Sequence, residues 1–231
     1  YPIDALLKEI NFKPDVIIQA ADTTYLYGKA PCRNVILMTD PHAVNYEPRL
    51  VNADHAFNMQ DFYRTEAQTW IPYAYYPPVH KYIKLDQKYD VVFSGLQYEH
   101  RKEALEKMKQ AGLNVLTTLG LIYDEYVRTY NEGLIAFNWS SKQDLPARFW
   151  EGLAMGRLVL TNKVPDLDKL SFKDGIDYVG FSSADEAVEK ALYYSKHIDE
   201  AHKIALHGRL GLDDHSYTNR CKKMLSIIEK L

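Results

Sequence analysis

Short apolar runs rich in β-branched residues alternate with longer stretches of helical period along this chain, and this alternation limits its fold more than any other feature. Strands separated by helical stretches pair in parallel, because each helix carries the chain back across the sheet. The pattern therefore predicts an α/β protein with parallel sheets. The expected strands lie near residues 15–19, 34–39, 55–59, 69–72, 89–95, 114–117, 133–138, 158–161 and 177–181. The expected helices lie near residues 102–111, 123–131, 147–155 and 184–197, with a terminal helix in the tail.

A proline pair, Pro77-Pro78, and the polar stretch that follows it separate two series of strands. Such a segment is typical of a linker, and we place the domain boundary near Lys84. This predicts an N-terminal Rossmann-like domain over residues 1–84, a C-terminal Rossmann-like domain over 85–214 and a C-terminal helix over 215–231. The first domain has too few strand–helix units for a full Rossmann domain of about six strands, so we expect it to be reduced or truncated.

The composition excludes several classes of protein. Lys and Arg number 28 against 31 Asp and Glu, so the chain lacks the basic excess of a non-specific nucleic-acid binder. No apolar stretch approaches the roughly 20 residues of a transmembrane helix. Cys32 and Cys221 fit no metal or disulfide spacing, which favours a reducing cytoplasm. The chain begins at Tyr1 without an initiator Met, which leaves open whether this start is natural.

Ligands of open α/β sheets bind beyond the carboxyl ends of the strands, where helix N-termini offer free N–H groups to phosphates. After one expected strand, Gly95 permits close backbone approach, and Arg101 and Lys102 bring positive charge for a diphosphate. An ordinary surface Arg-Lys pair is about equally favoured. After the next strand, Gly120 and Leu121 expose backbone that can pair with a nucleobase edge, although an ordinary turn is favoured there.

Two further strand ends carry polar groups. Asn138 and Ser140 suit a sugar or a phosphate, but such residues also favour loops. Arg148 and Glu151 are three residues apart near a helix start and so share one helix face. Arg148 would attract a diphosphate, and the Glu151 carboxylate would accept hydrogen bonds from both ribose hydroxyls. By spacing alone, a surface ion pair between Arg148 and Glu151 is the favoured alternative.

The segment Arg-Phe-Trp-Glu-Gly-Leu-Ala-Met-Gly at 148–156, with the strand Leu-Val-Leu-Thr at 158–161, resembles a motif of the group 1 glycosyltransferase superfamily. That motif is an R-x-x-E-x-x-A-x-G helix followed by a strand, and the likeness is strongest to the CgeB-like spore-maturation branch. Further matches follow in family order at residues 91–101, 138–139, 165–170 and 215–220. Together they span most of residues 89–231, which is more specific than any motif alone.

The resemblance implies a GT-B fold, with two Rossmann-like domains facing a cleft. It also implies a hexosyltransferase-like enzyme that moves a sugar from a nucleotide-diphosphate sugar, with a UDP-sugar favoured, to a hydroxyl acceptor. The acceptor, which can be a glycan, a protein, a small molecule or modified DNA, would enter from the first domain. By the same resemblance the donor-binding residues are Arg101 and Lys102 at the diphosphate, Gly120 and Leu121 at the base, and Glu151 at the ribose.

One departure from the family pattern concerns the sugar. Relatives with a Glu-x7-Glu signature carry a carboxylate where this chain has Gln143, with Asp144 beside it. Asp144 is therefore a candidate donor contact, and both sugar recognition and the retaining or inverting outcome stay open.

Glycosyl transfer needs charge stabilisation on the leaving diphosphate and, for inversion, a base. No strong Asp-x-Asp metal signature occurs, so we expect neither a metal ion nor a cofactor. Asp40 and His42 follow the strand at residues 34–39 and are the candidate catalytic residues, although a loop histidine is more often structural. Two alternatives remain: an inactive sugar-nucleotide or glycan-binding module of the same fold, and a transferase acting on modified nucleic-acid bases.

Overall fold

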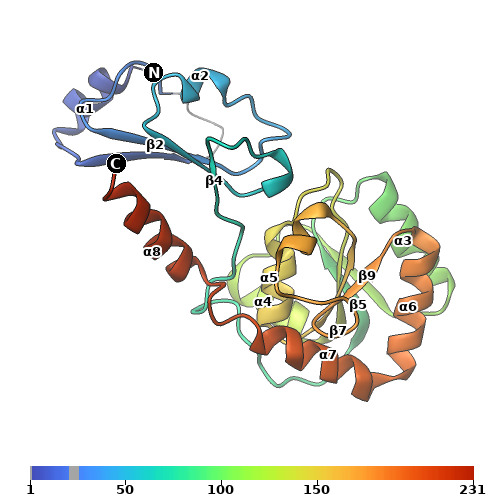
Figure 1. The fold of residues 1–231 in the computed structure, drawn as a ribbon. Coiled ribbons are helices and arrows are strands. Elements are labelled where there is room, and N and C mark those ends of the chain that lie inside the picture. Colours follow the sequence, from blue (N-terminus) through green and yellow to red (C-terminus); the bar gives the residue numbers. More distant parts are fainter. Residues whose placement is uncertain (1, 21–25) are drawn as a thin grey trace. The chain divides into compact units, whose positions relative to one another are not determined.

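The protein forms two compact units in a computed structural model that describes residues 2–20 and 26–231. The first unit comprises Tyr1–Pro72 and Thr218–Leu231, and the second comprises Tyr73–Tyr217. Each unit contains one sheet of parallel strands (Figure 1). The expected α/β class with parallel sheets is therefore confirmed.

The first unit contains a four-stranded sheet in the order β1-β2-β3-β4. Its described elements are α1 (Ile3–Ile10), β1 (Val16–Ala20), β2 (Arg33–Met38), α2 (Glu47–Leu50), β3 (His55–Asn58), the 3-10 helix η1 (Asp61–Tyr63), β4 (Thr69–Trp70) and α8 (Tyr217–Ile228). Successive side chains of each strand point to opposite faces of the sheet. Val35 and Phe57 pack with Met224 and Ile228 of α8, whereas Ile36 lies in a separate cluster on the other face. With few helices to cover it, this sheet is a reduced Rossmann-like unit.

The second unit contains a five-stranded sheet in the order β6-β5-β7-β8-β9. Its elements are β5 (Tyr89–Ser94), α3 (Glu99–Gln110), β6 (Val115–Thr118), α4 (Tyr123–Asn131), β7 (Gly133–Asn138), α5 (Ala147–Ala154), β8 (Leu158–Asn162), the 3-10 helix η2 (Pro165–Lys169), β9 (Val179–Phe181), α6 (Ala184–Lys196) and α7 (Ile198–Leu210). The chain adds β6 on one side of β5 and β7 on the other. Doubly wound sheets bind ligands at such a reversal of strand order.

Helices cover both faces of the second sheet (Figure 1). Phe93 and Phe137 point to the face covered by α3, α6 and α7. Their neighbours Val92 and Ala136 point to the face covered by α4 and α5, where Trp150 is fully buried. The continuous apolar runs of the sequence correspond to strands that are buried on both sides.

The division between the units lies at Pro72 and not near Lys84, where we expected it. Residues 73–84 belong to the second unit because their side chains and backbone bind there. Val79 and Ile83 pack against its core, and the N–H of Ile83 donates to Oδ1 of Asn131 at 2.8 Å.

The C-terminal tail also differs from the expectation of a separate helix over residues 215–231. It forms α8, which belongs to the first unit because its apolar side chains pack on that sheet. Among the described residues, no helix is long and apolar enough to cross a bilayer.

Candidate functional site

A cavity of about 620 Å³ lies at the carboxyl edge of the second sheet. Ser94 at the end of β5, residues 121–123 after β6 and the first turns of α5 all contribute to its wall. This edge lies beside the reversal of strand order between β5 and β7, where doubly wound sheets bind ligands. The lining residues are Tyr76, Val79, His80, Ser94, Leu121, Ile122, Tyr123, Tyr126, Pro146, Ala147, Arg148 and Glu151.

Arg148 brings a positively charged guanidinium to the wall of this cavity. Within the described part of the chain, its Nε is buried without a hydrogen-bond partner. The guanidinium lies 5.3 Å from the centroid of the Phe93 ring and close to Gly95, where an added Cβ would be 3.0 Å from Nη1. Gly95 has a φ of 146°, which side chains rarely adopt. The glycine therefore leaves room for a guanidinium that still has donors for an anion.

Arg101 is buried behind the same strand end. Its Nε donates to the carbonyl oxygen of Trp139 at 2.6 Å and its Nη1 to that of Leu96 at 2.9 Å. Burial, together with the charge of Arg148, lowers the pKa of Arg101 to about 10. Arg101 thus connects the loop after β5 to the loop after β7 by hydrogen bonds. Lys102 is exposed and does not line the cavity.

The Glu151 carboxylate does not form the surface ion pair with Arg148 that its spacing favoured. Its Oε2 accepts a hydrogen bond from the Tyr126 hydroxyl at 2.6 Å. Its Oε1 lies 3.6 Å from Nε2 of His80, and the side chain is 15% exposed. Among the described residues, no ion pair joins Arg148 to Glu151, so both side chains face the cavity independently.

The loop between β6 and α4 forms an apolar wall of the cavity. Gly120 has a φ of 78° and lies in the turn before Leu121, which lines the cavity with Ile122 and Tyr123. Ile122 and Tyr123 are 65% and 69% exposed. Exposed apolar groups of this size suit the flat face of a base.

The other three expected donor-binding residues, Asn138, Ser140 and Asp144, form hydrogen bonds with neighbouring residues, although Oδ1 of Asn138 is buried without a partner within the described residues. The amide Nδ2 of Asn138 donates to Oγ1 of Thr161 at 2.9 Å, and Asn138 is 1% exposed. The Ser140 hydroxyl donates to the Asp144 carboxylate, whose backbone N–H donates back to Ser140 Oγ at 3.0 Å. These side chains shape the loop that leads into α5, and none of the three lines the cavity.

Asp40 and His42 lie in the first unit, after β2. The Asp40 carbonyl accepts the N–H groups of Ala43 and Val44 at 2.9 and 3.0 Å, which forms the turn that carries His42. The His42 ring centroid lies 5.6 Å from that of Tyr63, and within the described residues its Nδ1 is buried without a hydrogen-bond partner. A catalytic role for Asp40 and His42 stays a prediction.

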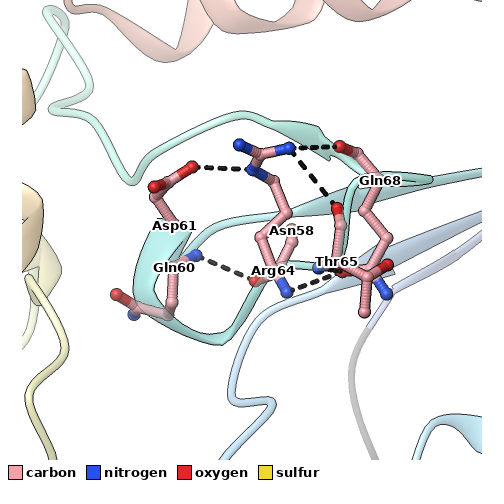
Figure 2. Close-up of polar contacts among 6 residues, drawn as sticks. All are labelled: Asn58, Gln60, Asp61, Arg64, Thr65 and Gln68. Carbon is pink, nitrogen blue, oxygen red and sulfur yellow. Dashed lines mark hydrogen bonds and ion pairs between the residues drawn. The ribbon is translucent and has the colours of Figure 1, made fainter.

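A polar network holds the neighbouring loop after β3 (Figure 2). The amide of Asn58 donates to Gln68 at 3.0 Å and accepts the backbone N–H of Gln60 at 2.9 Å. Arg64 donates to Asp61 at 2.6 Å and to the Gln68 carbonyl at 3.0 Å. The network fixes the short helix η1, which carries Tyr63 opposite His42.

A second cavity, of about 470 Å³, lies in the first unit and is lined by residues 29–34 and 51–54. These residues surround the amino ends of β2 and β3. Ligands of parallel sheets bind at the opposite edge, so the cavity lined by Arg148 and Glu151 at the carboxyl edge of the second sheet is the candidate site. Within residues 2–20 and 26–231, no three His, Cys, Asp or Glu side chains are grouped as a metal site.

Sequence reasoning missed most of the lining residues, among them the two whose side chains face the Glu151 carboxylate, His80 and Tyr126. His80 lies in the segment that we interpreted as a linker, where no pattern distinguishes a cavity residue. Tyr126 and Tyr130 are four apart on α4 and so share a face. That spacing was a usable signal for Tyr126, because it placed two hydroxyls on the side of α4 that packs on the sheet.

His80 makes the stability of the protein depend on pH. Burial lowers the pKa of its ring, and the Glu151 carboxylate offsets this only in part. The unfolded chain thus binds this proton more readily than the folded chain, so the free energy of unfolding falls as the pH drops below about 6.5. We expect the free energy of unfolding to fall less between about pH 7.5 and about pH 5.5 in His80→Asn than in the wild type, because the variant has no buried imidazole to protonate. Urea denaturation at the two pH values measures this difference.

The matched control for this comparison is His202→Asn, since His202 lies exposed on α7. Between the two pH values, the free energy of unfolding of this variant should fall by as much as that of the wild type. If it also fell by as much in His80→Asn, protonation of His80 would not be a source of the pH dependence.

Both a family model and solved structures resemble this chain. Residues 81–226 match the family model described as "Glycosyl transferase-like", whereas a search of curated proteins found no significant match. Solved structures share the fold at low identity. HepE from Anabaena, in complex with UDP and glucose, is 9% identical with a TM-score of 0.70, over 87% of this chain and 72% of that one.

Two further structures have the same fold. Sucrose-phosphate synthase from Thermosynechococcus elongatus is 13% identical with a TM-score of 0.61, over 85% of this chain and 58% of that one. The pneumococcal O-GlcNAc transferase GtfA, in complex with UDP and GlcNAc, is 10% identical with a TM-score of 0.62, over 99% and 59%. The expected GT-B fold is thereby confirmed. Together with the family match over more than half of its length, this shows that the chain belongs to the glycosyl transferase-like family of GT-B glycosyltransferases of the group 1 type.

Proposed function

We propose that the protein transfers a hexose from a nucleotide-diphosphate sugar, with a UDP-sugar favoured, to a hydroxyl acceptor. The observation that carries this proposal is the cavity of about 620 Å³, in which one wall presents both Arg148, whose Nε has no hydrogen-bond partner within the described residues, and the Glu151 carboxylate. A cation for a diphosphate and an acceptor-only group for sugar hydroxyls are the two recognition elements that a nucleoside diphosphate needs.

The donor would lie along this cavity. The base would pack against the wall formed by Leu121 and Ile122, the ribose would bind Glu151, and the diphosphate would face Arg148 and the N-terminus of α5. The buried charge of Arg101 would add to the positive potential, and Gly95 would allow the phosphates to approach the backbone. HepE and GtfA, which have the same fold, were solved with UDP and a sugar, which supports the same class of donor here.

In this proposal, transfer is independent of a metal ion, because the two arginines and the helix N-terminus would stabilise the leaving diphosphate. Asp40 and His42 remain the proposed catalytic residues, with His42 as the candidate base. The motif order also favours the CgeB-like branch of the superfamily. A cytoplasmic location is part of the same proposal and rests on the two free cysteines, Cys32 and Cys221.

A donor screen tests the proposal. The chain is incubated with UDP-, GDP- and dTDP-sugars, and both thermal stabilisation and nucleotide release are measured. We expect a UDP-sugar to raise the Tm and to release UDP. Stabilisation by none of the donors would contradict the proposal, and binding without release in the presence of hydroxyl acceptors would favour an inactive binding module.

A further inference from the structure

The two oxygens of the Glu151 carboxylate have different partners. Oε2 accepts the hydrogen bond of the Tyr126 hydroxyl at 2.6 Å, and Oε1 lies 3.6 Å from Nε2 of His80. Nδ1 of His80 lies 3.0 Å from the backbone N–H of Tyr76 and accepts its hydrogen bond. The neutral ring therefore carries its proton on Nε2, which points a second donor at Glu151.

Tyr126 is itself held firmly. Its ring centroid lies 4.6 Å from that of Tyr130, so the two rings pack against each other. The Tyr130 hydroxyl accepts the backbone N–H of Ser94 at 3.2 Å. Burial raises the pKa of Tyr126 well above its usual value, so its hydroxyl stays protonated and remains a donor. Tyr130, which is bound to the end of β5, thus packs against the ring of Tyr126, and the Tyr126 hydroxyl donates to the carboxylate of Glu151.

An ionised carboxylate has about four lone-pair sites for hydrogen bonds. Tyr126 occupies one of them, and His80 faces another. Two sites remain on a side chain that is 15% exposed and lines the cavity. A carboxylate held in this way matches a pair of neighbouring hydroxyls, such as the 2′- and 3′-hydroxyls of ribose.

We propose that Tyr126 and His80 are positioning residues that orient Glu151 and make the site select a ribonucleotide over its 2′-deoxy counterpart. This inference rests on the proposed function. A carboxylate that cannot turn leaves one of its lone pairs unsatisfied when the 2′-hydroxyl is missing, and an unsatisfied buried acceptor weakens binding. A carboxylate that is free to turn adapts to the single remaining hydroxyl, so the discrimination is lost.

The test compares the Kd values of UDP and 2′-deoxy-UDP by titration calorimetry. We expect the wild type to bind UDP at least about tenfold more tightly than 2′-deoxy-UDP. In Tyr126→Phe, which keeps the partly buried ring, the ratio of the two Kd values should fall to about threefold or less, because the fixed donor to Oε2 is gone. The matched control is Tyr178→Phe, since Tyr178 is a buried tyrosine of the second unit that does not line the cavity; its ratio should equal that of the wild type.

A second variant, His80→Asn, removes the other positioning side chain and leaves Tyr126 in place. In this variant too, the ratio of the Kd values of 2′-deoxy-UDP and UDP should fall. Thermal melts establish that each variant is folded. An unchanged ratio in a folded Tyr126→Phe variant would overturn the inference while UDP still binds. If Tyr126→Phe does not fold, an unchanged ratio in His80→Asn would overturn it. Failure of the wild type to bind UDP at all would instead overturn the proposed function on which it rests.

Discussion

Replacing Glu151 by alanine is expected to raise the Kd for UDP by at least about 100-fold, which corresponds to at least about 2.7 kcal/mol. The variant would lose two hydrogen bonds from ribose hydroxyls to a charged acceptor, and bonds to charged groups contribute about 1.5–3 kcal/mol each. Glu151 lies at 15% exposure on the cavity wall, so water replaces these bonds poorly. Titration calorimetry with UDP measures the change.

Glu132→Ala provides the matched control for this prediction. Glu132 is a buried glutamate of the second unit that pairs with Lys88 and Arg128 at 2.8 and 3.0 Å and does not line the cavity. Its removal should leave the Kd for UDP unchanged. An unchanged affinity in Glu151→Ala would show that this carboxylate has only a structural role with Tyr126 and His80.

Gly208→Ala is expected to destabilise the second unit by about 3 kcal/mol. Gly208 lies on α7, where this helix approaches the backbone before β9. A Cβ there would overlap the carbonyl oxygen of Asp177 and lie 2.6 Å from Cδ2 of Leu153. Because the overlapped atom belongs to the backbone, a rotamer change cannot relieve the contact, and α7 must move away from the sheet. Urea denaturation measures the loss.

The adjacent His207→Ala is the control for Gly208→Ala. His207 is exposed on the same helix, and alanine is a better helix former than histidine. This variant should be as stable as the wild type or slightly more stable. A Gly208→Ala variant with wild-type stability would mean that α7 packs less closely against residue 177 than the structure indicates.

The strands and most helices of the second unit follow from the sequence alone. The bounds of β7 and α4 agree with the expected ones, because Gly133–Asn138 contains a continuous apolar run that ends at Phe137 and Tyr123–Asn131 has a helical period. Both signals are local. The GT-B assignment required the family resemblance in addition, since alternating strands and helices fit many doubly wound folds.

Other parts of the fold depend on contacts that are distant in sequence. Helix α7 follows α6 directly, and its packing depends on Gly208 meeting the backbone of Asp177, which no local pattern indicates. The same reason explains the boundary at Pro72. The segment 73–84 has the composition of a linker, but Ile83 is bound by Asn131, a residue far along the chain.

The candidate site also contains residues that local spacing predicts and partners that are distant in sequence. Spacing placed Arg148 and Glu151 on one helix face, and both line the cavity. Their partners come from elsewhere: Tyr126 from α4, His80 from the entering segment and Phe93 from β5. Arg101, which we expected to contact the diphosphate, uses two donors on the carbonyls of Trp139 and Leu96. A local pattern identifies a charged side chain but not the donors that its neighbours already use.

The central claim is that a nucleoside diphosphate binds in the cavity lined by Arg148 and Glu151, and hydrogen–deuterium exchange with and without UDP tests it most directly. We predict slower exchange on UDP binding at the backbone amides of residues 94–98, 119–126 and 145–151, which surround the cavity. Protection confined to residues 29–34 and 51–54, around the cavity of the first unit, would contradict the claim, as would unchanged exchange throughout the chain at saturating UDP.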